Sequence, residues 1–339
     1  VHVRLPESAG WMKILVTGGA GYIGSVVSHQ LVGAGHEVEI VDDLSTGFAS
    51  NLAGGAKFHQ MSVHDVGEIL TPTAGFEAVL HFAGKIEVAE SVRNPEKYWQ
   101  QNIEGSLALL RAIRAAAVPR LIFSSTGSMY YGDGTRPFDE TNEVRPQNPY
   151  AATKAIIDLM IAGECGAGNL AAASLRYFNA SGAVLAEGRW LGERHDPESH
   201  LIPILLQTAL GERESFTLYG TDYPTTDGSC RRDYVHVSDL AEAHLLALDA
   251  LEPGRHEIFN LGNGQGFSNL EVLETVRTVT GREFPVLIGD RRPGDPAISV
   301  ASSEKAHRVL GWKPQRPELA DIIADAWAFH QAVHAEIRF

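Results

Sequence analysis

The sequence predicts an α/β protein with a doubly wound parallel sheet and a smaller α/β cap, and three observations predict it. A glycine-rich turn joins an apolar strand to a helix near the start, and strand and helix patterns then alternate through the first half. Two polar, aromatic segments punctuated by glycine follow, at 174–183 and 219–244. A chain of 339 residues that is 44% apolar can bury a large core around such a sheet.

The first strand and helix are expected around the glycine-rich turn. An apolar run at 13–17 predicts a strand, and Ile23, Val27 and Leu31 have the spacing of one helical face. The next strand is expected at 37–43. This order is that of a β-α-β unit in a parallel sheet.

The alternation continues with strands expected at 78–84 and 120–126 and a helix at 98–117 between them. In an open parallel sheet, ligands bind at the carboxyl ends of the strands. We therefore expect these strand-end residues on the ligand side: Ala83, Gly84, Ser124, Ser125 and Thr126.

The glycine turn has the spacing of a dinucleotide site of the Rossmann type. Gly18 permits a tight turn, Gly21 lets the backbone approach a pyrophosphate, and Gly24 lets the helix pack closely on the strand. Asp42 ends the next strand, where a carboxylate accepts hydrogen bonds from ribose hydroxyls and repels a 2′-phosphate. Because Asp43 follows and no arginine does, NAD is favoured over NADP.

Tyr150 and Lys154 are four residues apart on the helix expected after Pro149, and therefore share one face. A phenol has a reference pKa near 10, and nearby positive charge is needed to lower it. At about 7 Å and an effective dielectric of about 20, one ammonium contributes roughly 2.4 kcal/mol, or nearly two pKa units. A Tyr–Lys pair beside a nicotinamide cation can therefore act as a base near neutral pH.

Composition excludes several classes of protein. The net charge of −14 disfavours nucleic acid as a partner, and no apolar run has the roughly 18 residues that span a bilayer. Cys165 and Cys230 are expected to be free thiols, and no metal site is expected. A cytoplasmic location follows as the default, with residues 1–12 treated as an extension outside the fold.

Four segments, "TGGAGYIGS", "HFAGK", "FSST" and "YAATK", resemble the extended short-chain dehydrogenase/reductase superfamily. Within it, "RYFNASGA" and "YGTDYPTTDGSCRRDYVHVSDLAEAH" resemble the UDP-glucose (UDP-galactose) 4-epimerases. The resemblance extends from Met12 to about Trp327. It implies an isomerase that uses NAD and a UDP-sugar substrate.

The resemblance assigns a set of residues to each ligand. The NAD set is Gly18, Gly21, Tyr22, Ile23, Asp42, Asp43, Ser62, Val63, Phe82, Ala83, Gly84, Lys85, Asn102, Ser124, Tyr150, Lys154 and Tyr177. Ser62 and Val63 stand where the family usually has an acid at the adenine. The substrate set is Thr126, Asn179, His200, Leu201, Tyr219, Arg232, Arg292, Asp295 and Ser299.

The resemblance also implies a mechanism. Tyr150 takes the proton of the sugar 4-hydroxyl while hydride moves from C4 to NAD, and the 4-keto sugar turns over before hydride returns. Lys154 tunes Tyr150 and Thr126 shares the hydrogen bond of the 4-oxygen. "FSSTGSMYYGD" is one residue longer than the family's usual run, so Ser125 remains an alternative to Thr126 as the catalytic hydroxyl, and either tyrosine of "YY" can fill the following position.

The sugar and the reaction leave alternatives open. Ser299 occupies the position that limits the sugar 2-substituent in this family, so UDP-GlcNAc and UDP-GalNAc are expected to fit beside UDP-glucose and UDP-galactose. A UDP-pentose or a uronate is an alternative substrate. A 4,6-dehydratase is disfavoured because Gly127 and Ser128 follow Thr126 where that family has Asp-Glu, and a non-catalytic binding protein leaves Thr126, Tyr150 and Lys154 unexplained.

The domains are expected to interleave. The NAD-binding Rossmann domain covers 13–180, with 231–264 returning to it, and the UDP-sugar-binding cap covers 181–230 and 265–339. In the resembled family, two helices, here 98–117 and 150–168, pair with a second subunit, so a homodimer is expected.

Overall fold

A computed structural model describes residues 10–132, 136–292 and 295–337. Residues 1–9 of the expected extension lie outside the described residues. The chain packs as two compact units. The first unit comprises Val1–Ser125, Asn148–Leu175 and Ala241–Ile258, and the second comprises Thr126–Gln147, Arg176–Leu240 and Phe259–Phe339. Among the described residues, the second unit therefore includes 126–132, 136–147, 176–180, 231–240 and 259–264, which the predicted boundaries assign to the NAD-binding domain.

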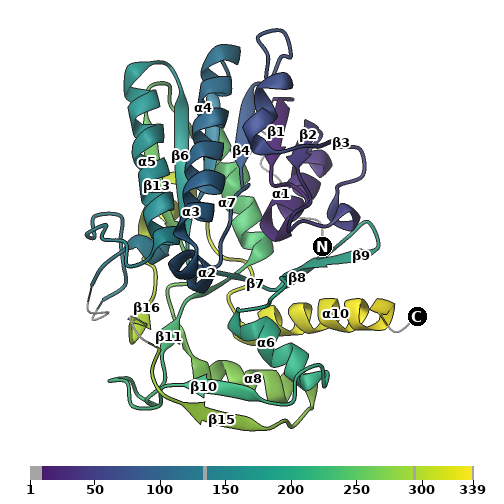
Figure 1. The fold of residues 1–339 in the computed structure, drawn as a ribbon, viewed down its shortest axis with the longest axis vertical. Helices are drawn as coiled ribbons and strands as arrows, with labels where there is room; N and C mark the ends of the chain where they lie inside the picture. The colour runs from purple at the N-terminus through teal and green to yellow at the C-terminus, as the bar shows by residue number, and fades with distance from the viewer. Residues whose placement is uncertain (1–9, 133–135, 293–294, 338–339) are drawn as a thin grey trace. The chain divides into compact units, whose positions relative to one another are not determined.

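A seven-stranded sheet has the order β13-β6-β5-β4-β1-β2-β3 (Figure 1). The pairs β1–β2, β1–β4, β2–β3 and β4–β5 are all parallel. The order reverses between β1 and β4, which is the switch point of a doubly wound sheet, so the predicted fold class is confirmed. The strands are β1 Lys13–Thr17, β2 Glu37–Asp42, β3 Lys57–Gln60, β4 Ala78–His81, β5 Arg120–Thr126, β6 Ala171–Tyr177 and β13 His256–Leu261.

The strand predicted at 78–84 ends earlier, at His81. The backbone N–H groups of Phe82 and Ala83 both donate to the carbonyl of Thr17, so the chain leaves the ladder at this point. Residues 82–84 consequently form a turn beside the end of β1.

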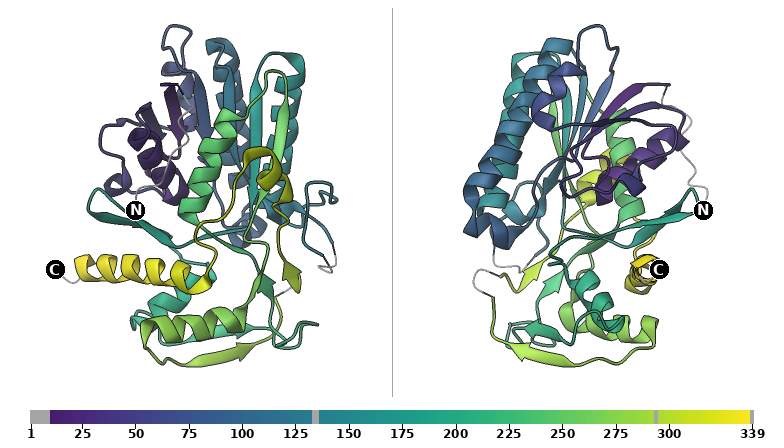
Figure 2. Two further views of the ribbon diagram at one scale, coloured as in Figure 1. Left: turned by 180° about the vertical axis from the view of Figure 1, so that it is seen from behind. Right: turned by 45° about the vertical axis from the view of Figure 1, so that its right-hand side comes forward.

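Helices cover both faces of the sheet (Figures 1 and 2). On one face lie α4 Gly105–Ala116 and α5 Pro149–Ala167, and on the other lie α1 Tyr22–Gly33 and the part of α7 (Val237–Asp249) that belongs to the first unit. Leu109, Leu110 and Ile113 of α4 pack against Leu121 and Phe123 of β5 in a buried core. The shorter elements are η1 Ala49–Asn51, η2 Val63–Glu68, α2 Val88–Arg93, α3 Pro95–Tyr98 and the π-helical turn η3 Trp99–Glu104.

The helix predicted at 98–117 is broken into α3, η3 and α4. A π-helical turn adds a residue to the helix and re-aims a side chain, which is common at functional sites. Here Asn102 of η3 is buried and bonds to a loop at the end of β4.

The second unit has short sheets around a separate core. Helices α6 Leu201–Ala209, α8 Asn269–Thr280 and α10 Leu319–Ile337 pack through Leu205, Val272 and Ile322. Ser268 and Glu271 form a capping box that starts α8. The remaining elements are η4 Gly127–Met129, β7 Asn179–Ser181, β8 Ala183–Ala186, β9 Arg189–Gly192, β10 Phe216–Tyr219, β11 Arg231–Arg232, β12 Tyr234–His236, β14 Phe267–Ser268, β15 Val286–Gly289, β16 Ile298–Ser299 and α9 Glu304–Leu310.

Both cysteines, Cys165 and Cys230, are free thiols and buried, as the sequence predicts. Of the helices in the described residues, none combines the length and the apolarity that crossing a bilayer requires.

Candidate active site

The glycine turn between β1 and α1 is closely packed, and two glycines are required by contact distances. A Cβ on Gly18 would lie 2.5 Å from the backbone nitrogen of Ala83, and one on Gly24 would lie 2.3 Å from the carbonyl oxygen of Gly18. Gly18 also has φ +75°, which favours glycine. The turn therefore holds the start of α1 against the ends of β1 and β4.

The start of α1 is suited to an anionic group. Its N-cap is Gly21, which has no side chain to cap the first turn, and the helix begins with Tyr22 and Ile23. The N–H groups and the dipole at such a helix start attract a phosphate. A pyrophosphate bound here would take the place of the absent side-chain cap.

Asp42 is nearly buried at the carboxyl end of β2. Its Oδ2 accepts from the backbone N–H of Ala20 at 3.0 Å and its Oδ1 from that of Leu44 at 2.9 Å. Burial raises the pKa of this carboxyl, and the two backbone donors oppose that effect. The carboxylate is thus held at the glycine turn, where the sequence predicts a contact to ribose, with Asp43 exposed next to it.

Asn102 clamps the loop after β4. Its Oδ1 accepts from the backbone N–H of Lys85 at 2.7 Å, and its Nδ2 donates to the carbonyl of Lys85 and to Thr153 Oγ1, each at 3.0 Å. A Cβ on Gly84 would lie 3.1 Å from Asn102 Oδ1 and 3.9 Å from Lys154 Nζ. The predicted residues Gly84, Lys85, Asn102 and Lys154 are therefore neighbours.

Lys154 is buried on α5, one turn after Tyr150. Its ammonium donates to the carbonyl of Ser124 at 2.8 Å and lies 4.7 Å from the ring centroid of Phe123. Burial lowers the pKa of Lys154 to about 8, while Asp158 opposes the shift. The side chain stays mostly charged at neutral pH and is fixed toward the end of β5.

The start of α5 is fixed by its cap. The side chain of Asn148 accepts from the backbone N–H of Ala151 at 2.8 Å, and Pro149 occupies the first helical position. Tyr150 is half-buried in the first turn. The cap therefore sets the direction from which the Tyr150 side chain leaves the helix.

The two hydroxyls at the end of β5 have different partners. Ser125 is buried, and its Oγ donates to Asp158 Oδ2 at 3.3 Å within the first unit. Thr126 begins the second unit; its Oγ1 accepts from the backbone N–H of Ser128 at 3.1 Å and so caps η4. The Thr126 hydroxyl also donates to Ser128 Oγ at 3.0 Å, so both hydroxyls have a partner and these contacts leave Ser125 as an alternative to Thr126.

Tyr130 and Tyr131, the two adjacent tyrosines that follow, also differ in their contacts within the second unit. Tyr130 is buried, its hydroxyl donates to Asn260 Oδ1 at 2.7 Å, and Arg176 donates to it at 2.9 Å. Tyr131 is 44% exposed and is covered by Arg145. Tyr130 is thus the tyrosine that the fold buries after η4.

Gly127 stands at the position where a 4,6-dehydratase has an acidic residue. A Cβ on Gly127 would lie 2.2 Å from Cε2 of Phe178. The ring of Phe178 therefore leaves no room for an aspartate after Thr126, and Ser128 is exposed. The packing supports the sequence-based argument against that reaction.

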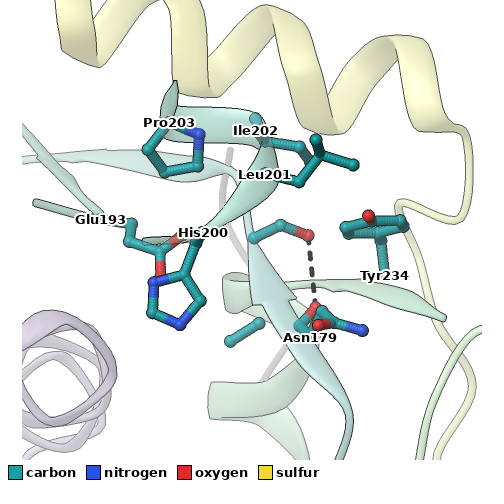
Figure 3. Close-up of a pocket in the computed structure, with 9 residues that line it drawn as sticks. Asn179, Glu193, His200, Leu201, Ile202, Pro203 and Tyr234 are labelled. Atoms are coloured by element: carbon teal, nitrogen blue, oxygen red, sulfur yellow. Dashed lines mark hydrogen bonds and ion pairs between the residues drawn. The ribbon is translucent and has the colours of Figure 1, made fainter. Parts of the chain in front are cut away.

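A pocket in the second unit collects several of the predicted substrate residues (Figure 3). Asn179 on β7, His200 and Leu201 at the start of α6, and Tyr234 on β12 contribute to it, together with Glu193. Asn179 Nδ2 donates to the carbonyl of Asp233 at 2.7 Å, which anchors β7 beside β12. The complete lining is Asn179, Ala180, Ser181, Glu193, His200, Leu201, Ile202, Pro203 and Tyr234.

Arg232 and Arg292 lie in the same unit but are not among the residues that line this pocket. Arg232 forms an ion pair with Asp295 and is in register with Ser299 in the pair β11–β16. The guanidinium of Arg292 lies 4.2 Å from the ring centroid of Tyr219. These five predicted substrate residues thus form two contacting groups on the second unit.

Sequence reasoning missed two buried polar residues that organise these regions. The two ring nitrogens of His81 hydrogen-bond to Thr17 Oγ1, at 2.6 Å, and to Ser106 Oγ, at 2.9 Å. Burial and the nearby charge of Lys154 lower the pKa of His81 to about 3. Asp233 accepts from the backbone N–H groups of three residues, Asn263, Gly264 and Ala301, and burial raises its pKa to about 6. His81 was adjacent to "FAGK" and Asp233 was within "RDY", but nothing in the sequence indicates their partners.

The sequence matches a known protein family over most of its length. The model of the NAD dependent epimerase/dehydratase family matches residues 14–262. The chain belongs to this family.

Curated members of the family extend the match to nearly the whole chain. A UDP-glucose 4-epimerase of Streptomyces lividans is 50% identical over 94% of this chain and 96% of its own length. One of Corynebacterium glutamicum is 47% identical over 95% of this chain and 97% of its own length. A solved UDP-glucose-4-epimerase from Stenotrophomonas maltophila with bound NAD and formylated UDP-arabinopyranose has a TM-score of 0.90 and 38% identity, over 96% of this chain and 99% of that chain.

The first unit fits the cofactor of an NAD dependent epimerase/dehydratase. The close-packed turn, the uncapped start of α1 and the carboxylate of Asp42 are suited to pyrophosphate and ribose. Ser62 caps η2 at the end of β3 with Val63 buried behind it, which places both at the neighbouring strand end. Phe82, Ala83, Gly84, Lys85 and Ser124 lie at the ends of β4 and β5, and Tyr177 is buried at the end of β6 in the second unit.

Proposed function

We propose that the chain inverts the configuration at C4 of a UDP-hexose, interconverting UDP-glucose and UDP-galactose with NAD held in the first unit. The observation that carries the proposal is the buried Lys154, which is fixed to the carbonyl of Ser124 one helical turn after Tyr150 and beside the clamped loop of Gly84 and Asn102. The names of the relatives, which are UDP-glucose 4-epimerases, support it.

In this proposal, Tyr150 moves the proton and Lys154 controls its pKa. The phenolate takes the proton of the sugar 4-hydroxyl and returns it to the 4-oxygen after inversion. The ammonium of Lys154 favours the phenolate electrostatically and can hold ribose hydroxyls. NAD, when bound, accepts hydride from C4 and returns it, so the reaction needs no outside oxidant. The hydroxyl of Thr126 donates to the 4-oxygen.

The second unit is proposed to anchor the UDP group. Guanidinium groups bind phosphate oxygens bidentately, which suits Arg232 and Arg292 for the diphosphate. Asn179, His200 and Leu201 line the pocket proposed for the nucleotide end, with Tyr219 stacked against Arg292. Asp295 holds Arg232 until the anion arrives.

We also propose that N-acetylated sugars fit. Ser299 is half-buried in β16 beside Arg232, and a serine leaves more room than an aromatic side chain would. Ser299→Tyr should remove turnover of UDP-GalNAc while retaining that of UDP-galactose. Full selectivity of the unmodified chain against UDP-GalNAc would contradict this part of the proposal.

A homodimer in the cytoplasm completes the proposal. Leu159 and Ile156 of α5 are 73% and 39% exposed, so this helix presents apolar surface that a second subunit can cover. Sedimentation of the purified chain tests the dimer, and Leu159→Glu should produce the monomer. The cytoplasmic location stays a prediction from composition.

The proposed function is tested by incubating the purified chain with UDP-galactose without added NAD and identifying the products by NMR. UDP-glucose is expected, and Tyr150→Phe should abolish its formation while Tyr131→Phe, on an exposed ring, should not. Loss of water to a 4-keto-6-deoxy product, or turnover unchanged in Tyr150→Phe, would contradict the proposal.

A further inference from the structure

We propose that Glu193, His195 and His200 of the second unit bind one divalent transition-metal ion, with Zn²⁺ the ion that this set of ligands favours. One ligand atom from each residue lies within 4.8 Å of the others. Glu193 Oε1 is 3.3 Å from His195 Nε2 and 3.1 Å from His200 Nδ1. A carboxylate with two imidazoles is a common zinc set.

The separations match those of ligands that share one ion. Zinc binds imidazole nitrogen and carboxylate oxygen at about 2.0–2.2 Å in a tetrahedron, which places neighbouring ligand atoms about 3.3 Å apart. Both measured separations from Glu193 Oε1 are close to this value. The two imidazole nitrogens lie within 4.8 Å of each other, so binding an ion requires at most a small approach of the two histidines.

Burial and charge favour a cation at this place. Glu193 is nearly buried, at 9% exposed, and a buried carboxylate is costly unless a cation or hydrogen bonds compensate it. His195 Nε2 is enclosed, and within the described residues no hydrogen bond of good geometry reaches it. A metal ion between these groups would satisfy the nitrogen and one carboxylate together.

Protonation of His195 is the alternative to a metal ion as compensation for the buried carboxylate of Glu193. Burial lowers the pKa of His195, but the adjacent Glu193 carboxylate outweighs burial, so the pKa is raised overall. Glu198 also contributes, as does His200 with the opposite effect. An imidazolium–carboxylate pair without metal is therefore the alternative that the test must exclude.

The chain builds the cluster with a backbone turn. Glu193 directly follows β9, and the carboxylate of Glu198 accepts from the backbone N–H groups of His195, Ser199 and His200 at 3.1, 2.9 and 3.0 Å. These bonds fold residues 195–200 so that both imidazoles face the carboxylate of Glu193, and His200 Nδ1 also lies 3.1 Å from Glu198 Oε1. The ligands are thus arranged by the protein itself, as metal sites require.

The cluster adjoins the pocket of the second unit. Glu193 and His200 point toward one another at its edge, and His200 directly precedes Leu201 (Figure 3). Three protein ligands leave one coordination position for water. A bound ion would fix the start of α6 and hence one wall of the pocket; that this wall holds UDP rests on the proposed function, whereas metal binding does not.

The experiment measures metal binding by the full chain without substrate. Protein treated with a chelator is titrated with Zn²⁺ against a metal-sensitive dye, and separately with Co²⁺ while the visible absorption is recorded. One ion per chain is expected, with the intense Co²⁺ bands of tetrahedral coordination. His195→Ala and Glu193→Gln should each weaken binding by at least about 100-fold, since even loss of a partner outside the coordination sphere costs about 10–100-fold.

A matched control is His334→Asn, because His334 Nδ1 lies 2.6 Å from Glu212 Oε1 in a histidine–carboxylate pair that, among the described residues, belongs to no group of three possible metal ligands. It should bind Zn²⁺ like the unmodified chain. Absence of tetrahedral Co²⁺ bands in the unmodified chain, or equal Zn²⁺ affinity in His195→Ala and the control, would overturn the metal site. The Co²⁺ result stands even if a variant fails to fold, and activity toward UDP-galactose is not part of either readout.

Discussion

The two units hold their functional groups in different ways. In the first unit, Lys154 and Asn102 are buried and bonded to backbone atoms, so their positions are fixed before any ligand arrives. In the second unit, Arg232 and Arg292 rest against Asp295 and Tyr219, partners that a phosphate can replace or join. The difference suggests that Tyr150 and Lys154 of the first unit control the rate of the chemical step, whereas the two arginines of the second unit control affinity.

The largest expected effect is that of Lys154→Met. Removing the ammonium should lower kcat by about 50-fold or more, because Tyr150 loses electrostatic support of roughly 2.4 kcal/mol. Because the pKa of Lys154 is lowered to about 8, its buried charge costs stability at pH 7, so nucleotide-free Lys154→Met should unfold in urea at the same or a higher concentration.

The sign of that effect can be checked by pH. When the pKa of a lysine is lower in the folded state, the free energy of unfolding rises with pH between its folded and its unfolded pKa. For Lys154 this rise begins at about pH 8, and it should vanish in Lys154→Met. A variant that unfolds more easily than the original chain and keeps the pH-dependent rise would show that Lys154 is mainly a structural residue.

Gly24→Ala tests whether the cofactor turn depends on close packing. Its Cβ would lie 2.3 Å from the carbonyl oxygen of Gly18, so we expect a loss of about 3 kcal/mol in the free energy of unfolding together with loss of bound NAD. Gly33→Ala is the matched control in the same helix, with no atom within 4 Å, and should stabilise by about 0.5–1 kcal/mol. Urea unfolding of both variants measures the difference; equal effects would refute the packing argument.

Arg232→Ala tests whether the second unit controls the affinity for the substrate. We expect KM for UDP-galactose to rise about 30-fold, equivalent to about 2 kcal/mol, with kcat changed by less than about 3-fold. Arg255→Ala, which breaks an exposed pair with Glu252, should leave both constants unchanged. A large fall in kcat for Arg232→Ala with KM unchanged would remove the proposed division between the units.

The smallest expected effect concerns the buried histidine of the first unit. The pKa of His81 is lowered to about 3, so between this value and about 6.5 the unfolded chain binds more protons and stability falls as pH falls. Between pH 7 and pH 5, His81→Gln should therefore lose about 2 kcal/mol less of its free energy of unfolding than the unmodified chain. Urea unfolding at both pH values measures it, and identical losses would show that His81 is not the responsible group.

The first unit was the more predictable from sequence because its site is made by local patterns. The strand at 13–17, the glycine turn and the strand at 120–126 are each encoded by neighbouring residues, and the structure confirms them. The π-helical turn η3 at Asn102 was not predictable, because the side chain of Asn102 bonds to Lys85 on another segment of the chain.

The second unit was predictable only through the resemblance. Its strands are two to four residues long, and Arg232 meets Asp295 and Ser299 across more than 60 residues of sequence. The carboxylate of Asp233 likewise depends on donors from two other loops. No periodicity can indicate such contacts. The cluster of Glu193, His195 and His200 is local in sequence, but the turn that brings its side chains together depends on hydrogen bonds to Glu198 that the residue pattern does not show.

The most direct test of the central claim follows the hydrogen at C4. UDP-galactose deuterated at C4 is converted by the purified chain in ordinary water without added NAD, and the product is examined by NMR. The account predicts UDP-glucose that retains deuterium at C4, because the hydride removed from one face returns to the other, and no product with Tyr150→Phe. Replacement of the deuterium by solvent hydrogen, or retention of turnover in Tyr150→Phe, would contradict it.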